Sequence, residues 1–140
     1  MIIENSNQEL LQNDQDYQQF LKDNPSKGTL KIRVSSASQA LPIENVKIVV
    51  SKKIGNNTII FFDGKTDESG MINNISLPTA RRVQSDLDVP QFTTYLIHAT
   101  YDPEKFDKFY DIGLCCGVSV IQNINITPNI SLEMRNNYGN

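Results

Sequence analysis

The residues of this sequence that could do chemistry are few and stand apart from one another. Cys115 and Cys116 are adjacent and are the only cysteines, and His98 is the only histidine. A structural zinc site needs four ligands, usually from separated cysteine pairs, and these three residues do not supply them. A disulfide between neighbouring cysteines would close a small, strained ring. We therefore predict no metal and no cofactor.

Two roles remain open for the cysteine pair. Consecutive residues of a strand point to opposite faces, so one interpretation is a buried thiol next to an exposed thiol, without a function. The other is disulfide cross-linking of chains through Cys115 or Cys116, which requires an oxidising setting such as a mature spore surface or an extracellular layer. The stretch DIGLCCGVSV predicts a strand end and a turn, with Gly117 at the bend before the last strand.

No catalytic set of residues can be assembled from the sequence. His98 lies in TYLIHAT, where alternation places it on the solvent face of a strand. The stretch DGKTDESG contains carboxylates, but a calcium loop of the EF-hand type needs a helix on each side, and strands are expected here. There is no G-x-S-x-G nucleophile motif and no glycine-rich phosphate loop. We predict that the chain is not an enzyme and has no catalytic residue.

Composition restricts the class of partner. The chain has 140 residues and a formal net charge of −3, with its basic residues scattered, whereas a nucleic-acid-binding protein presents a basic face. Apolar runs such as IIFF are far shorter than the roughly 20 residues of a membrane span. The N-terminus MIIENSNQELL lacks the features of a secretory signal. We expect no nucleic acid, no membrane insertion and no signal peptide.

The N-terminal residues 1–27 differ from the rest and form an arm. Apolar residues recur in it at helical spacing, which predicts an amphipathic helix at about residues 7–23. Ser6 or Asn7 would cap this helix, and Asn24-Pro25 would end it, because a residue before proline avoids the α region. The arm could instead be disordered. If helical, it would dock on its own domain or on a neighbouring subunit, through Leu10, Leu11, Tyr17, Phe20 and Leu21.

Residues 28–128 change to the alternating pattern of β-strands. Stretches such as TLKIRV and NVKIVV alternate apolar and polar residues, and short turns such as IGNN and DESG separate them. Seven strands are expected in this way, and their connections are too short for crossover helices. We predict an all-β fold, a seven-stranded immunoglobulin-like or transthyretin-like sandwich, with a short helical or disordered N-terminal arm and a polar tail at residues 129–140.

Four stretches resemble, in order, the carboxypeptidase regulatory-like, transthyretin-like domains. GTLKIRVSSASQALPIENVKIVV resembles the first two strands and the turn between them, and KTDESGMINNISLPT resembles the next turn and strand. VPQFTTYLIHATYD and DIGLCCGVSVIQNINITP resemble an aromatic strand and the closing pattern. The set is similar to accessory domains of clostridial (Firmicute) spore proteins, among them the N-terminal domain of the spore cortex-lytic enzyme and related peptidoglycan-associated proteins. Cys115 and Cys116 depart from the pattern, which has an aromatic and a polar residue there.

The sandwich of that family is not its catalytic part, and the resemblance therefore implies a non-catalytic role. Our leading hypothesis is a structural or assembly protein of a bacterial spore or cell-envelope layer, which contacts itself or another protein of that layer through the arm or its strand edges. An alternative is an accessory module that binds peptidoglycan or another glycan through the aromatic residues Phe106, Phe109 and Tyr110. A further alternative is a regulatory partner of a cell-wall hydrolase.

Overall fold

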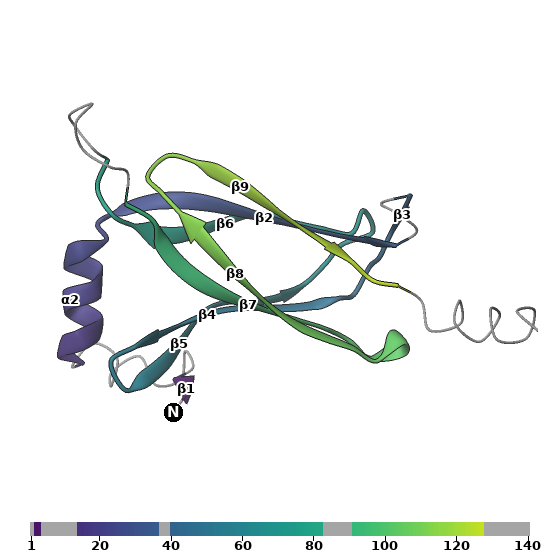
Figure 1. Cartoon of the computed structure of the whole chain (residues 1–140), viewed down its shortest axis with the longest axis horizontal. Coiled ribbons are helices and arrows are strands. Elements are labelled where there is room, and N and C mark those ends of the chain that lie inside the picture. The colour runs from purple at the N-terminus through teal and green to yellow at the C-terminus, as the bar shows by residue number, and fades with distance from the viewer. Residues whose placement is uncertain (1, 4–13, 37–39, 83–90, 128–140) are drawn as a thin grey trace, which may run out of the picture.

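Two β-sheets pack face to face, and one helix lies at one end of them, in a computed structural model that describes residues 2–3, 14–36, 40–82 and 91–127 (Figure 1). Seven strands of seven or more residues form the sandwich, and each coincides with a strand predicted from the sequence. They are β2 (Ser26–Ser36), β4 (Lys47–Ile54), β5 (Asn57–Lys65), β6 (Met71–Thr79), β7 (Thr93–Tyr101), β8 (Phe106–Leu114) and β9 (Ser119–Asn125). The predicted all-β sandwich is confirmed. Two unpredicted strands of two residues each, β1 (Ile2–Ile3) and β3 (Leu41–Pro42), extend the sheets.

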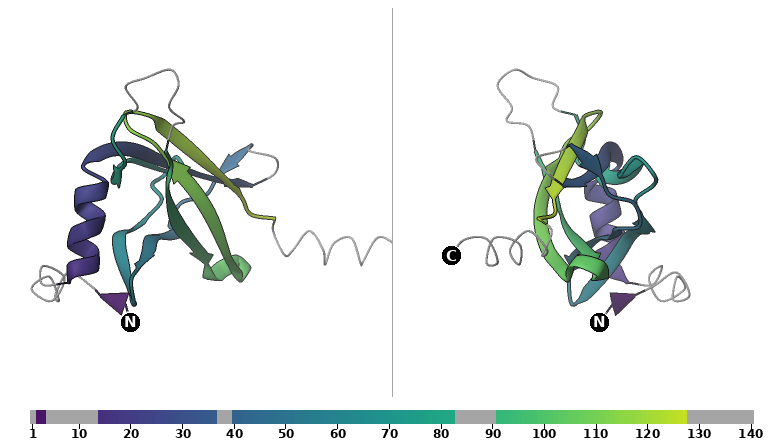
Figure 2. Two further views of the ribbon diagram at one scale, coloured as in Figure 1. Left: turned by 60° about the vertical axis from the view of Figure 1, so that its left-hand side comes forward. Right: turned by 90° about the vertical axis from the view of Figure 1, so that its right-hand side faces the viewer.

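The strand order places β8 and β9 at neighbouring edges of the two sheets. The first sheet has the order β1-β5-β4-β7-β8, and β8 pairs there with β7 over its whole length. In the second sheet, β6 and β9 both pair with residues 29–33 of β2, so they lie on opposite sides of it. A short turn joins β8 to β9, and the two strands lie on the same side of the sandwich in all views (Figures 1 and 2).

Alternation within the strands builds the core between the sheets. Leu30, Ile32 and Val34 of β2 are fully buried, as the pattern predicts. Tyr95 of β7 is the largest fully buried side chain, and its hydroxyl donates a hydrogen bond to the carbonyl oxygen of Pro78. Burial raises the pKa of Tyr95. A buried hydroxyl needs such a partner, because an unpaired polar group in the interior is costly.

Replacing Tyr95 with phenylalanine should lower the free energy of unfolding by about 1–2 kcal/mol, because the Pro78 carbonyl would lose its donor in a buried setting. Urea denaturation followed by circular dichroism measures the change. Tyr110→Phe is the matched control, because that hydroxyl makes no hydrogen bond found among the described residues. An equal loss in both variants would contradict the assigned role of the Tyr95 bond.

The helix α2 (Gln15–Asp23) begins later than predicted. Its N-cap is Asp14, whose carboxylate accepts hydrogen bonds from the backbone N–H groups of Asp16 (2.8 Å) and Tyr17 (3.1 Å). The bond from Tyr17, followed by one from the Asn57 side chain, holds the pKa of Asp14 below its usual value. The end of the helix before Asn24-Pro25 agrees with the prediction. Residues 4–13 lie outside the described residues, and with them the predicted caps.

A bulge in β5 prepares the surface on which α2 docks. Val50 of β4 pairs with Phe62 and the next residue, Ser51, pairs with Ile60, so Phe61 is the extra residue of β5. The Phe61 ring lies between two other rings. Its centroid is 5.3 Å from that of Tyr95 and 5.9 Å from that of Phe20. The bulge therefore links the buried aromatic residue of α2 to the core.

The described part of the arm docks on its own domain. Phe20 is 8% exposed, and Tyr17 and Leu21 are half-buried against the core. At the end of the helix, the Thr93 hydroxyl donates a hydrogen bond to the Asn24 side chain (2.6 Å). Three of the five predicted contact residues therefore pack within this chain, while Leu10 and Leu11 lie outside the described residues. Within the described ranges, α2 is too short and too polar to cross a membrane, and it is the sole α-helix there.

Candidate functional site

The cysteines lie in a tight turn between β8 and β9. The backbone N–H of Gly117, at φ 73°, donates a hydrogen bond to the Lys27 carbonyl (3.0 Å), and that of Val118 bonds to the Cys115 carbonyl (3.2 Å). The predicted strand end and bend at Gly117 are present. Because β8 ends at Leu114, strand alternation does not reach the pair, and both thiols are free and half-buried.

The turn is held close to β2. A Cβ atom at Gly28 would lie 2.9 Å from the Cys115 carbonyl oxygen, closer than such atoms approach. The glycine lets the turn pack directly on the strand. The position of the turn that carries the two cysteines is thus set by its backbone contacts with Lys27 and Gly28 of β2.

Cross-linking through the cysteine pair stays a prediction. Mild oxidation of the purified protein should produce a dimer band on a non-reducing gel, because both thiols are partly accessible. The band should disappear with reductant and in the Cys115→Ser/Cys116→Ser double variant. A monomer band alone under oxidising conditions would contradict the cross-linking role.

The three aromatic residues predicted to contact a glycan do not share a face. Phe109 is 59% exposed on the outer face of β8. Phe106 and Tyr110 are half-buried and pack against the core. Instead, Phe109 meets His98, its partner on β7. Their rings stack with centroids 4.1 Å apart and an interplanar angle of 8°.

His98 also contacts a carboxylate. Its Nε2 atom lies 2.7 Å from Oδ1 of Asp107, on the same outer face of β8. An imidazole oriented by a carboxylate is part of many catalytic sites, but those also hold a nucleophile or substrate in a cleft. This pair lies on an open sheet surface, and neither pocket described below includes it. The sequence contains a signal for the contact between His98 and Phe109. The short turn predicted at DPEK sets the register of the two strands that it joins, and this register places His98 opposite Phe109.

Lys52 is a charged residue near the docked helix that the sequence did not single out. Its ammonium donates a hydrogen bond to the Thr94 carbonyl (2.7 Å) and lies 5.9 Å and 5.7 Å from the ring centroids of Phe20 and Tyr95. Burial lowers the pKa of Lys52. These contacts connect β4, β7 and α2, which indicates a role in holding the helix.

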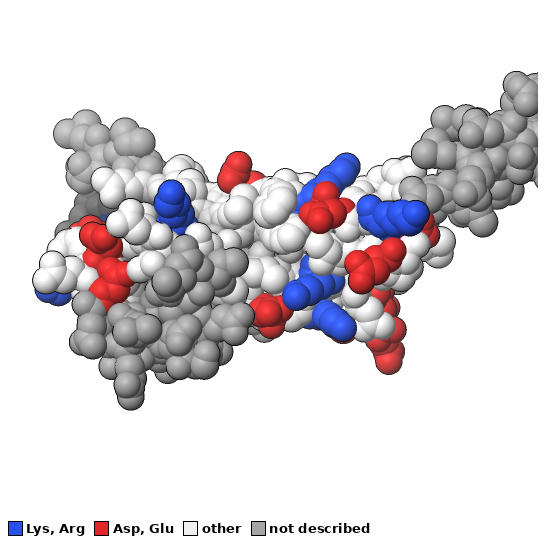
Figure 3. Space-filling view, turned by 90° about the horizontal axis from the view of Figure 1, so that it is seen from below, with Lys and Arg blue, Asp and Glu red and all other residues white. Residues whose placement is uncertain are grey.

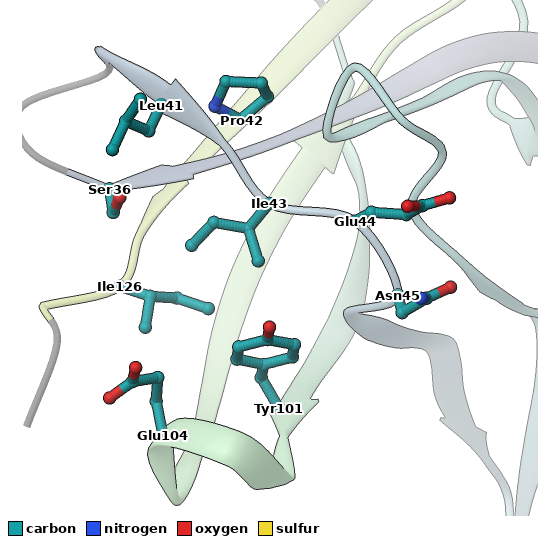
Figure 4. A pocket seen from close by; sticks show the side chains of 9 residues that line it. All are labelled: Ser36, Leu41, Pro42, Ile43, Glu44, Asn45, Tyr101, Glu104 and Ile126. Carbon is teal, nitrogen blue, oxygen red and sulfur yellow. The ribbon is translucent and has the colours of Figure 1, made fainter.

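Two adjoining pockets lie at the end of the sandwich opposite α2. The larger, of about 410 Å³, is bounded by β3, residues 43–45, the end of β7, the short 3₁₀ turn η2 (Asp102–Glu104) and Ile126 (Figure 4). The smaller, of about 300 Å³, shares Glu44, Asn45 and Tyr101 with it and includes Lys47 and Lys65. No sequence pattern indicated this site, because its walls come from four separate stretches of the chain.

On the face seen in Figure 3, acidic and basic side chains are interspersed, and the described residues form no continuous basic patch there. No group of three or more histidine, cysteine, aspartate or glutamate residues that could hold a metal ion occurs among the described residues.

Comparison with known proteins shows a likeness of fold. No protein-family model matches the sequence, and no curated protein matches it. Among solved structures, the chain is similar to the 5-hydroxyisourate hydrolase of Klebsiella pneumoniae, with 17% identity and a TM-score of 0.49. The likeness covers 73% of this chain and 91% of the hydrolase chain. At this identity it concerns the fold alone.

This likeness corrects one prediction from the sequence. The expectation that the chain is not an enzyme is contradicted, because the similar structure, of transthyretin-like fold, is that of a hydrolase. The expectation took the sandwich to be a non-catalytic module, and a fold does not determine whether a site on it is catalytic. The likeness does not assign the hydrolase's reaction to this chain.

Proposed function

We propose that this chain is an assembly protein in which two copies join edge to edge through β8. The observation that carries the proposal is the position of β8, which pairs with β7 on one side and with no described strand on the other. Such an edge presents unpaired N–H and C=O groups to another strand. The further proposal that the assembly belongs to a bacterial spore or cell-envelope layer is supported by the sequence resemblance alone.

Exposed apolar side chains occur on β8 and in segments that adjoin it in the chain or the sheet. Phe109 lies on β8 itself, Phe92 lies beside Gly113 of β8, Val118 lies in the turn that follows β8, and Ile121 lies on β9 of the other sheet. These are four of the five large apolar side chains that are exposed among the described residues. Exposed apolar side chains next to an unpaired edge favour association with another chain.

The charges on β8 favour one register for an antiparallel pair of β8 strands. Residues opposite each other in such a pair lie on the same face. In a pair centred on Tyr110, the middle residue of β8, every residue of the strand has a partner. Phe109 then lies opposite Asp111 of the partner subunit. A pair centred one residue earlier would set Asp107 opposite Asp111, and a pair centred one residue later would set Asp111 opposite its own copy. Like charges directly opposite are unfavourable, so we propose the Tyr110-centred register.

Light scattering coupled to size-exclusion chromatography tests the proposal. In the presence of reductant, which removes disulfides, the mass should rise from 15.8 kDa towards twice that value as the concentration increases. A constant monomer mass over the whole series would contradict association through β8. Retention on purified peptidoglycan by a strict monomer would instead favour the glycan-binding alternative.

A further inference from the structure

The outer face of the second sheet carries basic side chains and no carboxylate. β2 is its central strand over residues 29–33, with β6 on one side and β9 on the other. Alternation along β2 turns Lys27, Lys31 and Arg33 outward, where two of them are exposed and Lys31 is half-buried. The four strands of this sheet contain no aspartate or glutamate. Three basic and no acidic side chains give the sheet a formal charge of +3, in a chain whose net charge is −3.

The three cations lie in a line and are unpaired. Successive outward positions of a strand are about 7 Å apart, so Lys31 and Arg33 are neighbours and Lys27 lies about 13 Å from Lys31. No ion pair or side-chain hydrogen bond joins any of the three to another described residue. Asp67, in the turn that leads into β6, accepts hydrogen bonds from two backbone N–H groups of its own turn. The row therefore presents its positive charge to solvent.

The side chains around this row are uncharged and form hydrogen bonds in both directions. No aromatic residue and no histidine occurs on the four strands. The strands β2, β6 and β9 form the upper layer in Figure 1, so their outer face is turned away from the viewer in Figure 3. Serine hydroxyls and asparagine amides can each donate and accept. The exposed ones on β6 and β9 are Asn73, Asn74, Ser76, Ser119, Asn123 and Asn125.

We infer that this face binds an anionic polysaccharide, which lies along β2. A line of three cations is complementary to a linear polyanion, whereas a small anion would reach only Lys31 and Arg33. The hydroxyl groups of the sugars would pair with the serine and asparagine side chains on both sides of the row. A single-stranded nucleic acid fits this face less well, because its bases stack on aromatic side chains.

The inference goes beyond the proposed assembly and does not depend on it. The charged row belongs to the second sheet, whereas the proposed dimer contact runs along β8 of the first. It also differs from the glycan contact predicted from the sequence, which used aromatic residues of β8. Polysaccharide binding and association through β8 are therefore measured at different residues and can fail separately.

Titration of the ¹⁵N-labelled full chain with an oligomer of galacturonic acid, followed by two-dimensional NMR, tests the inference. The oligomer carries a carboxylate on each sugar, and its methyl-esterified form is the matched neutral compound. At low salt, the acidic oligomer should cause saturable shifts at the amides of Lys31, Arg33 and Asn123. The ester should bind at least about tenfold more weakly, the difference expected for three surface ion contacts. Added salt should weaken binding of the acidic oligomer, because the charges are at the surface.

Two double variants separate this face from the overall charge of the chain. Lys31→Gln/Arg33→Gln should weaken binding of the acidic oligomer about tenfold, through the loss of two ion contacts. Lys47→Gln/Lys65→Gln is the control, because these exposed residues are paired on β4 and β5 and the variant removes the same two charges from the first sheet. It should change binding by less than about twofold. Equal effects of the two variants, equal binding of acid and ester, or shifts confined to other residues would each overturn the inference.

Competition identifies the class of polymer. The galacturonate oligomer, oligothymidylate and polyglutamate are compared at equal concentrations of charge, with the amide shifts of Lys31 and Arg33 as the measure. Tightest binding of the galacturonate oligomer is the expected result. Tighter binding of oligothymidylate or of polyglutamate would assign the face to a nucleic acid or to an acidic peptide, and would overturn the inference.

Discussion

Replacing Phe109 with aspartate should abolish most of the dimer, and replacing it with lysine should not. In the Tyr110-centred register, residue 109 lies opposite Asp111 of the partner subunit, at two symmetric positions. Aspartate would set like charges opposite each other at both positions, and lysine would set opposite charges there. Cross-strand pairs contribute about 0.2–1 kcal/mol each, so reversing the sign of two pairs should change the dissociation constant by roughly tenfold at low salt.

The two variants are matched, because both lose the stacking of Phe109 on His98. Sedimentation velocity at low and high salt measures the dissociation constants, and thermal melts show whether both variants are folded. Adding Asp111→Lys to Phe109→Asp should restore the dimer by reversing the charges. Equal weakening by aspartate and lysine would exclude the proposed register, and no effect of either would exclude β8 as the contact.

Replacing Phe20 with alanine should lower the free energy of unfolding by about 3 kcal/mol, a large part of the total stability of a small domain. Phe20 is the buried side chain of α2, and its ring contacts Phe61 at the β5 bulge. Gln19→Ala on the exposed face of the same helix should change it by less than about 0.5 kcal/mol. Chemical denaturation measures both, and a similar small change in both variants would show that the helix is not part of the folded unit.

The docked helix changes how association has to be tested. If α2 were a free arm for a neighbouring subunit, deleting it would be a clean test of assembly. Because Phe20 and the cap residue Asn24 contact Phe61 and Thr93 of the same chain, deletion is expected to destabilise the domain itself. Substitutions on the outer face of β8 separate association from folding better.

Local patterns in the sequence were sufficient to predict the strands and several turns. Alternation at Leu30, Ile32 and Val34 shows which residues of β2 are buried, because one face of a sheet packs on the core. The turn at DESG requires a residue with positive φ, and Gly70 supplies it at 71°. Such features depend on neighbours in the sequence, which is why they were predictable.

The start of the helix was predicted less well. Apolar spacing in the arm does not mark Asp14 as the start of α2, and Ser6 and Asn7 are as suitable for capping as Asp14 by residue type. What distinguishes Asp14 is its contact with Asn57 at the start of β5, in addition to the N–H groups of its own helix. A helix boundary that depends on such a distant contact cannot be read from propensity.

What the sequence by itself determined is the set of β-elements, because each strand and turn is specified by residues close together in the chain. The tertiary structure decided which of them meet. It paired β9 in parallel with β2, docked Phe20 of α2 on Phe61, and brought Ile43, Tyr101 and Ile126 around one pocket. These contacts join residues whose separation in the chain is bridged only by sheet packing, and no local pattern encodes such a meeting.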